Sequence, residues 1–250
     1  MIDALGLREQ VETSGYALVP SVLDCGEIQH LLSIPESVEE SSPSLRRRGG
    51  VFAVRNLLEV SPEIRELAGS PVVRRLVEPI LGPKAFPVRG ILFDKTPDAN
   101  WKVPWHQDVT IAVADRIDVD GFGPWSIKAG VLHVQPPAAI LENMISVRLH
   151  LDSCGEENGA LRVIPGSHRM GKLPEQEAAR IGAEEECSVC AAGAGGALLM
   201  RPLLLHASSA STTPKHRRII HIDFASVNLP NGMKWDIEAS LARRGEHLFA

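Results

Sequence analysis

The apolar residues near the start of the chain recur at helical spacing. Residues 3–14 place apolar side chains on one face and charged ones on the other, which predicts an amphipathic helix that ends at Gly15. A second helix is expected over residues 70–81, because Pro71 suits the first turn of a helix and Gly82 suits the position just past its end. Both ends of this second helix therefore carry a local signal.

Residues 1–83 as a whole have a mainly helical pattern. A further helical segment begins near Leu23 and ends before Pro35. The stretch SSPSLRRRGG, residues 41–50, has the composition of a loop. Its arginines could meet a phosphate or carboxylate, although a solvated basic turn also explains them.

From Lys84 onward the chain consists of short β-prone runs separated by Gly, Pro and Asn. Turns are predicted at residues 157–159 (Glu-Asn-Gly) and 165–167 (Pro-Gly-Ser). Most of these runs have no helical stretch between them, which favours an antiparallel sandwich or barrel over a parallel sheet. The expected strands are Phe86–Phe93, Ile145–Leu151, Ala160–Ile164, Ala197–Met200, Leu203–His206 and Arg218–Phe224.

A long insertion interrupts this β-rich part. Residues 109–143 are rich in Asp, Gly and Pro. A loop of this length in a compact domain is typically a lid or a binding loop, and the alternative is a poorly ordered insertion. We expect one domain over residues 1–250, with a β core at 84–226, the lid within it and a C-terminal tail at 227–250.

The charge balance changes the range of possible partners. Lys and Arg total 26 and Asp and Glu total 31, for a net charge of −5. Such a chain has no general attraction for nucleic acid or anionic membranes. Aromatic residues make up only 4% of the chain, so stacking platforms for single-stranded nucleic acid are not expected either. These counts exclude nucleic acid and membranes as general partners and leave the oligomeric state open.

The N-terminus and the cysteines bear on the compartment. The segment MIDALGLREQVE has charges where a signal peptide needs an apolar core, and no apolar run approaches the ~20 residues that span a bilayer. Cys187 and Cys190 have the spacing of half a zinc site, but Cys25 and Cys154 supply no second pair. We therefore expect free thiols in a reducing, cytoplasmic compartment.

The most informative segment is WKVPWHQDV, residues 101–109. His106 and Asp108 lie two apart in a β-prone context, where side chains at i and i+2 share a face. An imidazole and a carboxylate in one cavity are two of the three ligands of a facial triad, which suits iron(II) because it leaves coordination positions open. Alone, the pair is weak evidence, because a hydrogen-bonded His–Asp couple at the surface is more common.

A third ligand is available farther along the chain. His206 ends the apolar run Pro202–His206, where it could also be an ordinary core histidine. Arg217 follows 11 residues later (217 − 206 = 11), at the entrance of the next expected strand. A turn would return it to the level of His206, and arginine binds carboxylates through two charge-assisted hydrogen bonds. Ser208 could donate a further hydrogen bond from the same face.

Together these segments resemble the phytanoyl-CoA dioxygenase family. The resemblance rests on Trp105-His106-Gln107-Asp108, on Asn158–Leu161 with Pro165–His168, and on the spacing from His206 to Arg217. It extends from about Phe86 to Ser226. It implies a mainly β fold with flanking helices, the double-stranded β-helix (jelly roll) of the cupin type.

The resemblance also implies chemistry. His106, Asp108 and His206 would bind iron(II), and Arg217 with Ser208 would hold the carboxylate of the co-substrate 2-oxoglutarate. With O₂, such an enzyme oxidises a small molecule, most often by hydroxylation, and releases succinate and CO₂. Related halogenases lack the carboxylate ligand, so Asp108 favours hydroxylation or another oxidation over halogenation.

Several further residues are candidates for other roles. Arg148 lies where the family places side chains that contact the co-substrate. Lys95 matches a lysine that recurs in the family, and the sequence does not indicate its role. Trp125 and His133, in the insertion, are candidates for substrate contact, although loop packing explains them equally well. Residues 46–55 could also contact the substrate. His150 and His168 are expected to be structural, and His216 to face solvent.

Two other classes of function remain open. A jelly-roll isomerase, epimerase or hydrolase could use the same metal ligands without O₂, but it would have no need for Arg217 and Ser208. A non-catalytic metabolite-binding module could keep the cavity alone, but it would have no need for all three metal ligands.

Overall fold

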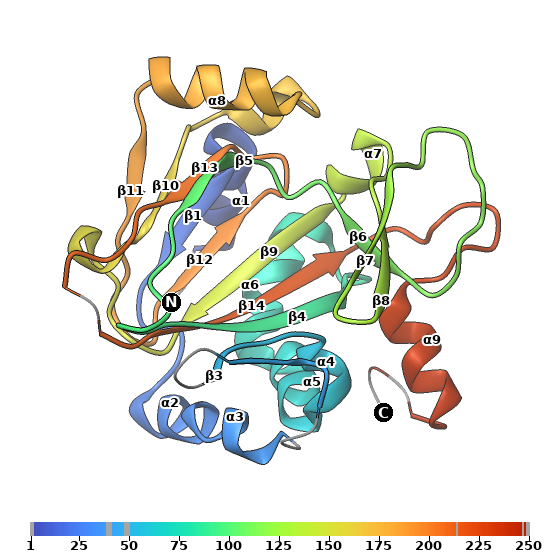
Figure 1. Cartoon of the computed structure of the whole chain (residues 1–250), viewed down its shortest axis with the longest axis horizontal. Coiled ribbons are helices and arrows are strands. Elements are labelled where there is room, and N and C mark those ends of the chain that lie inside the picture. The colour runs from blue at the N-terminus through green and yellow to red at the C-terminus, as the bar shows by residue number, and fades with distance from the viewer. Residues whose placement is uncertain (1–2, 39–41, 48–50, 214, 247, 249–250) are drawn as a thin grey trace.

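The computed structural model describes residues 3–38, 42–47, 51–213, 215–246 and 248. Within these residues the strands form three antiparallel sheets, of seven, four and three strands. The two larger sheets face each other as a β-sandwich, with helices packed around them (Figure 1). No described helix is long and apolar enough to cross a membrane.

The seven-stranded sheet has β14 at its centre, between β9 and β4. Its order is β1-β12-β9-β14-β4-β3-β2. The strands, in chain order, are β1 (Tyr16–Val19), β2 (Leu45–Arg47), β3 (Val51–Val54), β4 (Phe86–Lys95), β9 (Met144–His150), β12 (Ala197–Met200) and β14 (Arg217–Ala225).

The central strands have two chemically different faces. All seven residues of β9 are buried, yet apolar and polar side chains alternate along it. Ile145, Val147 and Leu149 belong to the main hydrophobic core. Ser146, Arg148 and His150 fall on the opposite face, because successive side chains of a strand point to opposite sides. The same alternation on β14 gives the sandwich a polar interior at this place.

The helices pack around the sheets and bury apolar faces. Helix α6 contacts β9 and buries Val73, Leu76 and Val77. The helices are α1 (Ala4–Ser14), α2 (Cys25–Leu32), α3 (Ile34–Ser37), α4 (Leu57–Val60), α5 (Pro62–Gly69), α6 (Pro71–Leu81), α7 (Ala138–Leu141), α8 (Glu175–Glu184) and α9 (Asp236–Arg243), with 3₁₀ turns at Glu156–Asn158 and Ser167–Met170.

The helices predicted over residues 3–14 and 70–81 are confirmed. Gly15 ends α1 with a φ of 84°, a left-handed conformation that favours glycine. The Ser70 side chain caps the N-terminus of α6, and Gly82 follows its last residue. Local sequence signals therefore set these ends.

The four-stranded sheet closes the other side of the sandwich. Its order is β11 (Ser188–Cys190), β10 (Leu161–Val163), β13 (His206–Ser208) and β5 (Val103–His106). Helix α8 lies over β5, where Gly182 faces the Trp105 ring so closely that an added Cβ would lie 2.2 Å from it. Trp105 therefore points outward to α8, and the next residue, His106, points inward.

The insertion at 109–143 is an ordered sheet. It contains β6 (Ile111–Val113), β7 (Trp125–Lys128) and β8 (Val131–Val134), in the order β6-β8-β7, followed by α7. Strands β7 and β8 form a hairpin, and this sheet lies beside one end of the sandwich (Figure 1). The sequence indicated a loop here and did not predict these strands, because such short strands carry little local signal.

Two further expectations need correction. Residues 203–205 are not a strand. They form a turn in which Leu204 N–H donates to Arg201 O, and the strand begins at His206. The loop expected at 41–50 contains β2, while residues 41 and 48–50 lie outside the described part of the chain.

Candidate metal centre

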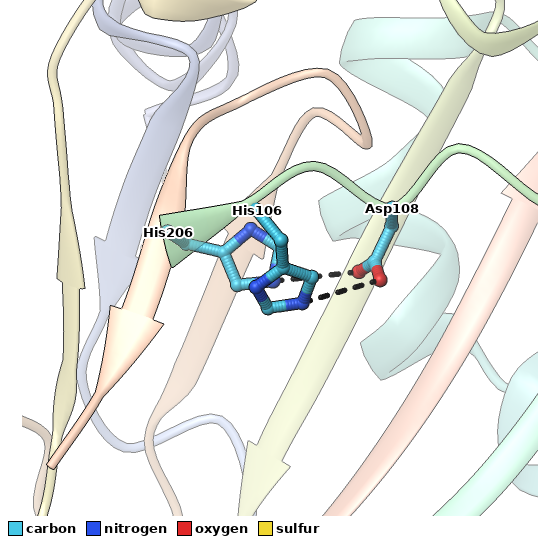
Figure 2. Close-up of side chains that lie close together, drawn as sticks. All are labelled: His106, Asp108 and His206. Carbon is cyan, nitrogen blue, oxygen red and sulfur yellow. Dashed lines mark ion pairs between the residues drawn. The ribbon is translucent and has the colours of Figure 1, made fainter. Parts of the chain in front are cut away.

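Three side chains from two segments meet inside the sandwich. His106 ends β5 and His206 begins β13, and the two residues are paired across the antiparallel ladder. Asp108 lies just beyond β5, where its N–H donates to Pro202 O at 2.9 Å. Each of the three offers a ligand atom within 4.8 Å of the others, and all three point toward one place (Figure 2). Asp108 was expected within a strand, and the structure places it after one.

Both imidazoles are held in the tautomer that suits a metal ligand. His106 Nδ1 lies 2.9 Å from Pro104 O, and His206 Nδ1 lies 2.9 Å from Leu204 O. Because a carbonyl only accepts, each Nδ1 carries the proton and each Nε2 keeps a lone pair. The two Nε2 atoms lie 3.9 and 3.6 Å from the Asp108 carboxylate oxygens.

The protonation states fit the same role. Burial lowers the pKa of His206 to about 4, so its imidazole is neutral at pH 7. Burial opposes ionisation of Asp108, but His206, His221 and His106 outweigh it and hold the pKa of that carboxyl well below its usual range. A neutral imidazole and an ionised carboxylate are the forms that bind metals. Two imidazoles and one carboxylate at these distances fit iron(II).

Gln107 fixes the chain between two of the predicted ligands. Its Nε2 donates to Gly171 O at 2.8 Å and to Leu203 O at 2.7 Å, and its Oε1 accepts from Leu173 N–H at 2.8 Å. The sequence reasoning gave Gln107 no role of its own. Its position between His106 and Asp108 was the available signal.

A cavity of about 180 Å³ extends from the candidate centre between the sheets. Antiparallel pairing on β14 orders its polar residues into rungs: Arg217 opposite Lys95, His221 between Ile91 and Arg148, and Asp223 between Arg89 and Ser146. We call the Arg217–Lys95 rung the inner end and the Asp223–Arg89 rung the outer end. Lining residues include Arg89, Asp108, Arg148, His206, Ser208 and Arg217.

The inner end is a buried cationic site. Arg217 is 3% exposed and Lys95 is 1% exposed. Lys95 Nζ donates to Ser208 Oγ at 3.2 Å and to Ser209 O at 2.8 Å. Burial, and then Arg217, lower the pKa of Lys95 to about 7.

Arg217 has an incomplete set of partners. It donates to Gly159 O through Nη1, while its Nε is buried without a hydrogen-bond partner. No carboxylate of the described residues lies within ion-pair distance of Lys95 or of the Arg217 guanidinium. Buried charges are usually paired, so the inner end fits an anionic group such as the distal carboxylate of 2-oxoglutarate.

Arg148 takes part in a network beside the centre. Its Nη1 lies 2.9 Å from His221 Nδ1, and His221 Nε2 lies 2.8 Å from Asp223 Oδ1. Ser146 Oγ donates to the same carboxylate oxygen at 2.6 Å. Arg148 also lies over the Phe93 ring, 6.0 Å from its centroid, so its position is set by the protein itself.

The two substrate-contact candidates lie outside this cavity. Trp125 is half-buried on β7, and the Arg116 guanidinium lies 5.4 Å from its ring centroid. His133 is buried on β8 and lines a smaller neighbouring cavity together with Arg89. Thus His133, and not Trp125, adjoins a residue that also lines the main cavity.

The remaining histidines have local partners. His168 Nε2 lies 3.2 Å from Glu12 O, which ties the 3₁₀ turn to α1. His216 is 60% exposed and its Nδ1 lies 2.7 Å from Asp94 Oδ2. His150 is buried, and its Nδ1 has no hydrogen-bond partner.

Comparison with known proteins identifies the family of the chain. The sequence matches the phytanoyl-CoA dioxygenase (PhyH) family over residues 11–219. No curated protein sequence is significantly similar to the chain.

Solved structures share the fold at low sequence identity. EctD from S. alaskensis, crystallised with 2-oxoglutarate and 5-hydroxyectoine, has a TM-score of 0.68 at 18% identity, over 90% of this chain and 77% of that one. The non-haem α-ketoglutarate-dependent epimerase SnoN from nogalamycin biosynthesis has a TM-score of 0.65 at 21% identity, over 90% and 81%. The carbocyclase SnoK, from the same biosynthesis, has a TM-score of 0.66 at 14% identity, over 89% and 84%. The predicted jelly roll is confirmed.

Proposed function

Because the chain belongs to the phytanoyl-CoA dioxygenase family of iron(II)- and 2-oxoglutarate-dependent enzymes, we propose that it hydroxylates an unactivated C–H bond of a small molecule. The observation that carries this proposal is one cavity that contains both a His-Asp-His cluster and a buried cationic end, which no carboxylate of the described residues neutralises. An iron centre needs the first feature, and a dicarboxylate co-substrate needs the second.

The proposed roles follow from position. His106, Asp108 and His206 hold iron, and Arg217, Lys95 and Ser208 hold the distal carboxylate of 2-oxoglutarate. When bound, iron and 2-oxoglutarate supply the oxidising chemistry, with O₂ consumed and succinate and CO₂ released. Nδ1 hydrogen bonds orient the two imidazoles, and the buried rungs of β14 exclude water from the inner end.

The substrate side of the proposal concerns the insertion. We propose that residues 1–250 act as one domain, in which the sheet of residues 109–143 covers the substrate near the outer end. His133 is the better supported of the two predicted contact residues, because it adjoins Arg89. Trp125 would act through the packing of β7.

The presence of Asp108 supports hydroxylation over halogenation, since a carboxylate ligand occupies the position that a halide would need. No carboxylate of the described residues pairs with the inner end, which argues against an isomerase or hydrolase that uses no 2-oxoglutarate. The three clustered metal ligands argue against a non-catalytic binding module. SnoN and SnoK are an epimerase and a carbocyclase. Incorporation of ¹⁸O from ¹⁸O₂ into the product separates hydroxylation from those outcomes.

The first test is an anaerobic titration of the metal-free protein with iron(II) and 2-oxoglutarate, followed by the visible metal-to-ligand charge-transfer band. We expect a band in the wild type, its loss in His106→Ala and its weakening in Arg217→Ala. Iron binding without a band would overturn the oxygenase proposal and favour the O₂-independent alternatives.

A further inference from the structure

A second group of cations, Arg89, Lys128 and Arg55, lies near the outer end of the cavity, and of the three only Arg89 is among the residues that line it. Arg89, on β4, lines both the main cavity and the smaller one beside His133. Its Nη1 lies 3.7 Å from Asp223 Oδ2, which is a loose ion pair. The Asp223 carboxylate is already shared with His221 and Ser146. Arg89 is therefore only partly neutralised.

Lys128 approaches the same place from the insertion. It ends β7, and its Nζ donates to Thr110 Oγ1 at 3.0 Å, two residues after Asp108. Burial, and then Arg89, lower the pKa of Lys128, while Asp108 opposes this change. No carboxylate of the described residues lies within ion-pair distance of Lys128 Nζ. If iron is bound, the charge of Asp108 is directed to the metal.

Arg55 completes the group from the segment that follows β3. Its Nε is buried without a hydrogen-bond partner. Burial lowers the pKa of Arg55, and repulsion from Arg89 and Arg46 lowers it further. The next residue, Asn56, donates from Nδ2 to Ala129 O at 3.4 Å, which joins this segment to the β7–β8 hairpin.

The co-substrate cannot neutralise this end as well. Arg217 and Asp223 are six residues apart on β14 (223 − 217 = 6). A strand rises about 3.3 Å per residue, so the inner and outer rungs are about 20 Å apart. A five-carbon diacid that binds Arg217 and the metal is far shorter than this distance. Glu59 and Asp236 line the smaller cavity with Arg89, but among the described residues only Asp223 comes within ion-pair distance of Arg89, Lys128 or Arg55. One loose ion pair for three cations leaves a place for an anion from outside the protein.

We propose that the substrate carries an anionic carboxylate or phosphate group, which docks between Lys128, Arg89 and Arg55 and directs the rest of the molecule toward His106, Asp108 and His206. This inference rests on the proposed function for the reaction, and on the outer cations alone for the anion.

The test uses three probes with the same alkyl chain: hexyl phosphate, hexanoate and 1-hexanol. Calorimetric titrations are made with the iron- and 2-oxoglutarate-loaded protein under anaerobic conditions, so that the inner end is occupied. We expect at least one anion to bind about tenfold more tightly than 1-hexanol, as one charge-assisted hydrogen bond would give. Tighter binding of hexyl phosphate would identify a phosphate substrate, and tighter binding of hexanoate a carboxylate. Equal binding of all three probes would overturn the proposal.

Variants locate the binding. Lys128→Met should remove most of the preference for the anion, and Arg55→Met should do the same if Lys128→Met does not fold. Lys84→Met, in the exposed turn between α6 and β4, removes one positive charge elsewhere and should leave the preference unchanged. A preference that survives in both outer-end variants would also overturn the proposal.

The anion-binding proposal can be tested even if the oxygenase proposal is wrong. If no iron–2-oxoglutarate complex forms, the same titrations on the metal-free protein still test the outer end. Lys128→Met then separates binding there from binding at Arg217. A lost charge-transfer band with a retained, Lys128-dependent preference for anions would reject only the oxygenase proposal.

Discussion

The two ends of the cavity are both cationic but are built differently. At the inner end, Lys95, Ser208 and Arg217 all come from strands of the two larger sheets and are almost fully buried. At the outer end, Arg89 comes from such a strand, whereas Lys128 comes from the inserted hairpin. The inner end is therefore formed by strands of the jelly roll alone, whereas the insertion supplies one cation of the outer end.

This difference separates chemistry from recognition. Residues fixed by long antiparallel ladders suit a co-substrate that is the same for a whole family. Residues on an inserted hairpin can change without altering the ladders that hold the candidate centre. Substitutions at the inner end and the centre should thus affect metal and co-substrate binding, and those at the outer end should affect the substrate alone.

The largest effect is expected at the candidate centre. Asp108→Ala removes the carboxylate ligand and should lower iron(II) affinity by at least about 100-fold, since outer partners of a ligand alone account for about 10–100-fold. The measurement is an anaerobic iron titration. Asp98→Ala, which removes an exposed carboxylate, is the control. Wild-type iron affinity in Asp108→Ala would reject the assignment of the centre.

The next effect compares neighbours on β14. Arg217→Met should weaken 2-oxoglutarate binding by about 10–100-fold, because charge-assisted hydrogen bonds contribute about 1.5–3 kcal/mol. Arg218→Met should leave that affinity unchanged, since Arg218 points to the other face and binds Asp152 at 2.7 and 2.8 Å. Equal losses in both variants would indicate a structural effect and remove the distinction between the two ends.

A smaller effect is expected from Gln107→Ala. Loss of its three hydrogen bonds frees the chain between His106 and Asp108, so iron affinity should fall by about tenfold. Asn100→Ala is a matched control, because Asn100 joins its loop to Ser211 by two hydrogen bonds and touches no predicted ligand. If both variants lose stability but only Gln107→Ala loses iron affinity, Gln107 positions the ligands.

The smallest effect concerns stability and pH. Burial, helped by Arg148 and Arg217, lowers the pKa of His150 to about 4, against about 6.5 in the unfolded chain. Between these values the unfolded state takes up a proton that the folded state does not, so stability falls as the pH falls from 6.5 to 4. At pH 5.5, protonation of His150 in the unfolded chain should lower the free energy of unfolding by on the order of 1 kcal/mol. His150→Leu should abolish this decrease.

Thermal unfolding of the metal-free protein across this pH range measures the effect. The fall in Tm should be smaller in His150→Leu by about 2–4 °C. His30→Leu removes an exposed histidine and serves as the control. An unchanged slope of Tm against pH in His150→Leu would mean that the pKa of His150 is the same in the folded and unfolded states, against this prediction.

Local signals account for what the sequence predicted of the fold. Helices α1 and α6 were predictable because Gly15, Ser70 and Gly82 mark their ends. The strand expected at 203–206 was wrong because its three leucines are buried by tertiary packing while their backbone turns. Apolar composition alone does not distinguish a buried turn from a buried strand.

The candidate site was predictable only as a set of residues. The spacing of His106 and Asp108 indicated one cavity, the family resemblance added His206, and the structure brings the three ligand atoms together. Lys95 contacts Ser208 and Ser209, which lie more than 100 positions away in the chain. No local sequence pattern predicts contacts between residues so far apart. The cations of the outer end come from three distant segments for the same reason.

The pairing of His106 with His206 across β5 and β13 bears on the entropy of the unfolded chain. The two residues are 100 positions apart (206 − 106 = 100), so a metal bound to both would close a loop of that length. A cross-link of that span can lower the entropy of the unfolded chain by an amount equivalent to about 4.7 kcal/mol. The closure cost grows only with the logarithm of loop length. Because the insertion lies inside the loop, its length could change greatly while the stabilisation from a metal bound to both strands would stay nearly the same.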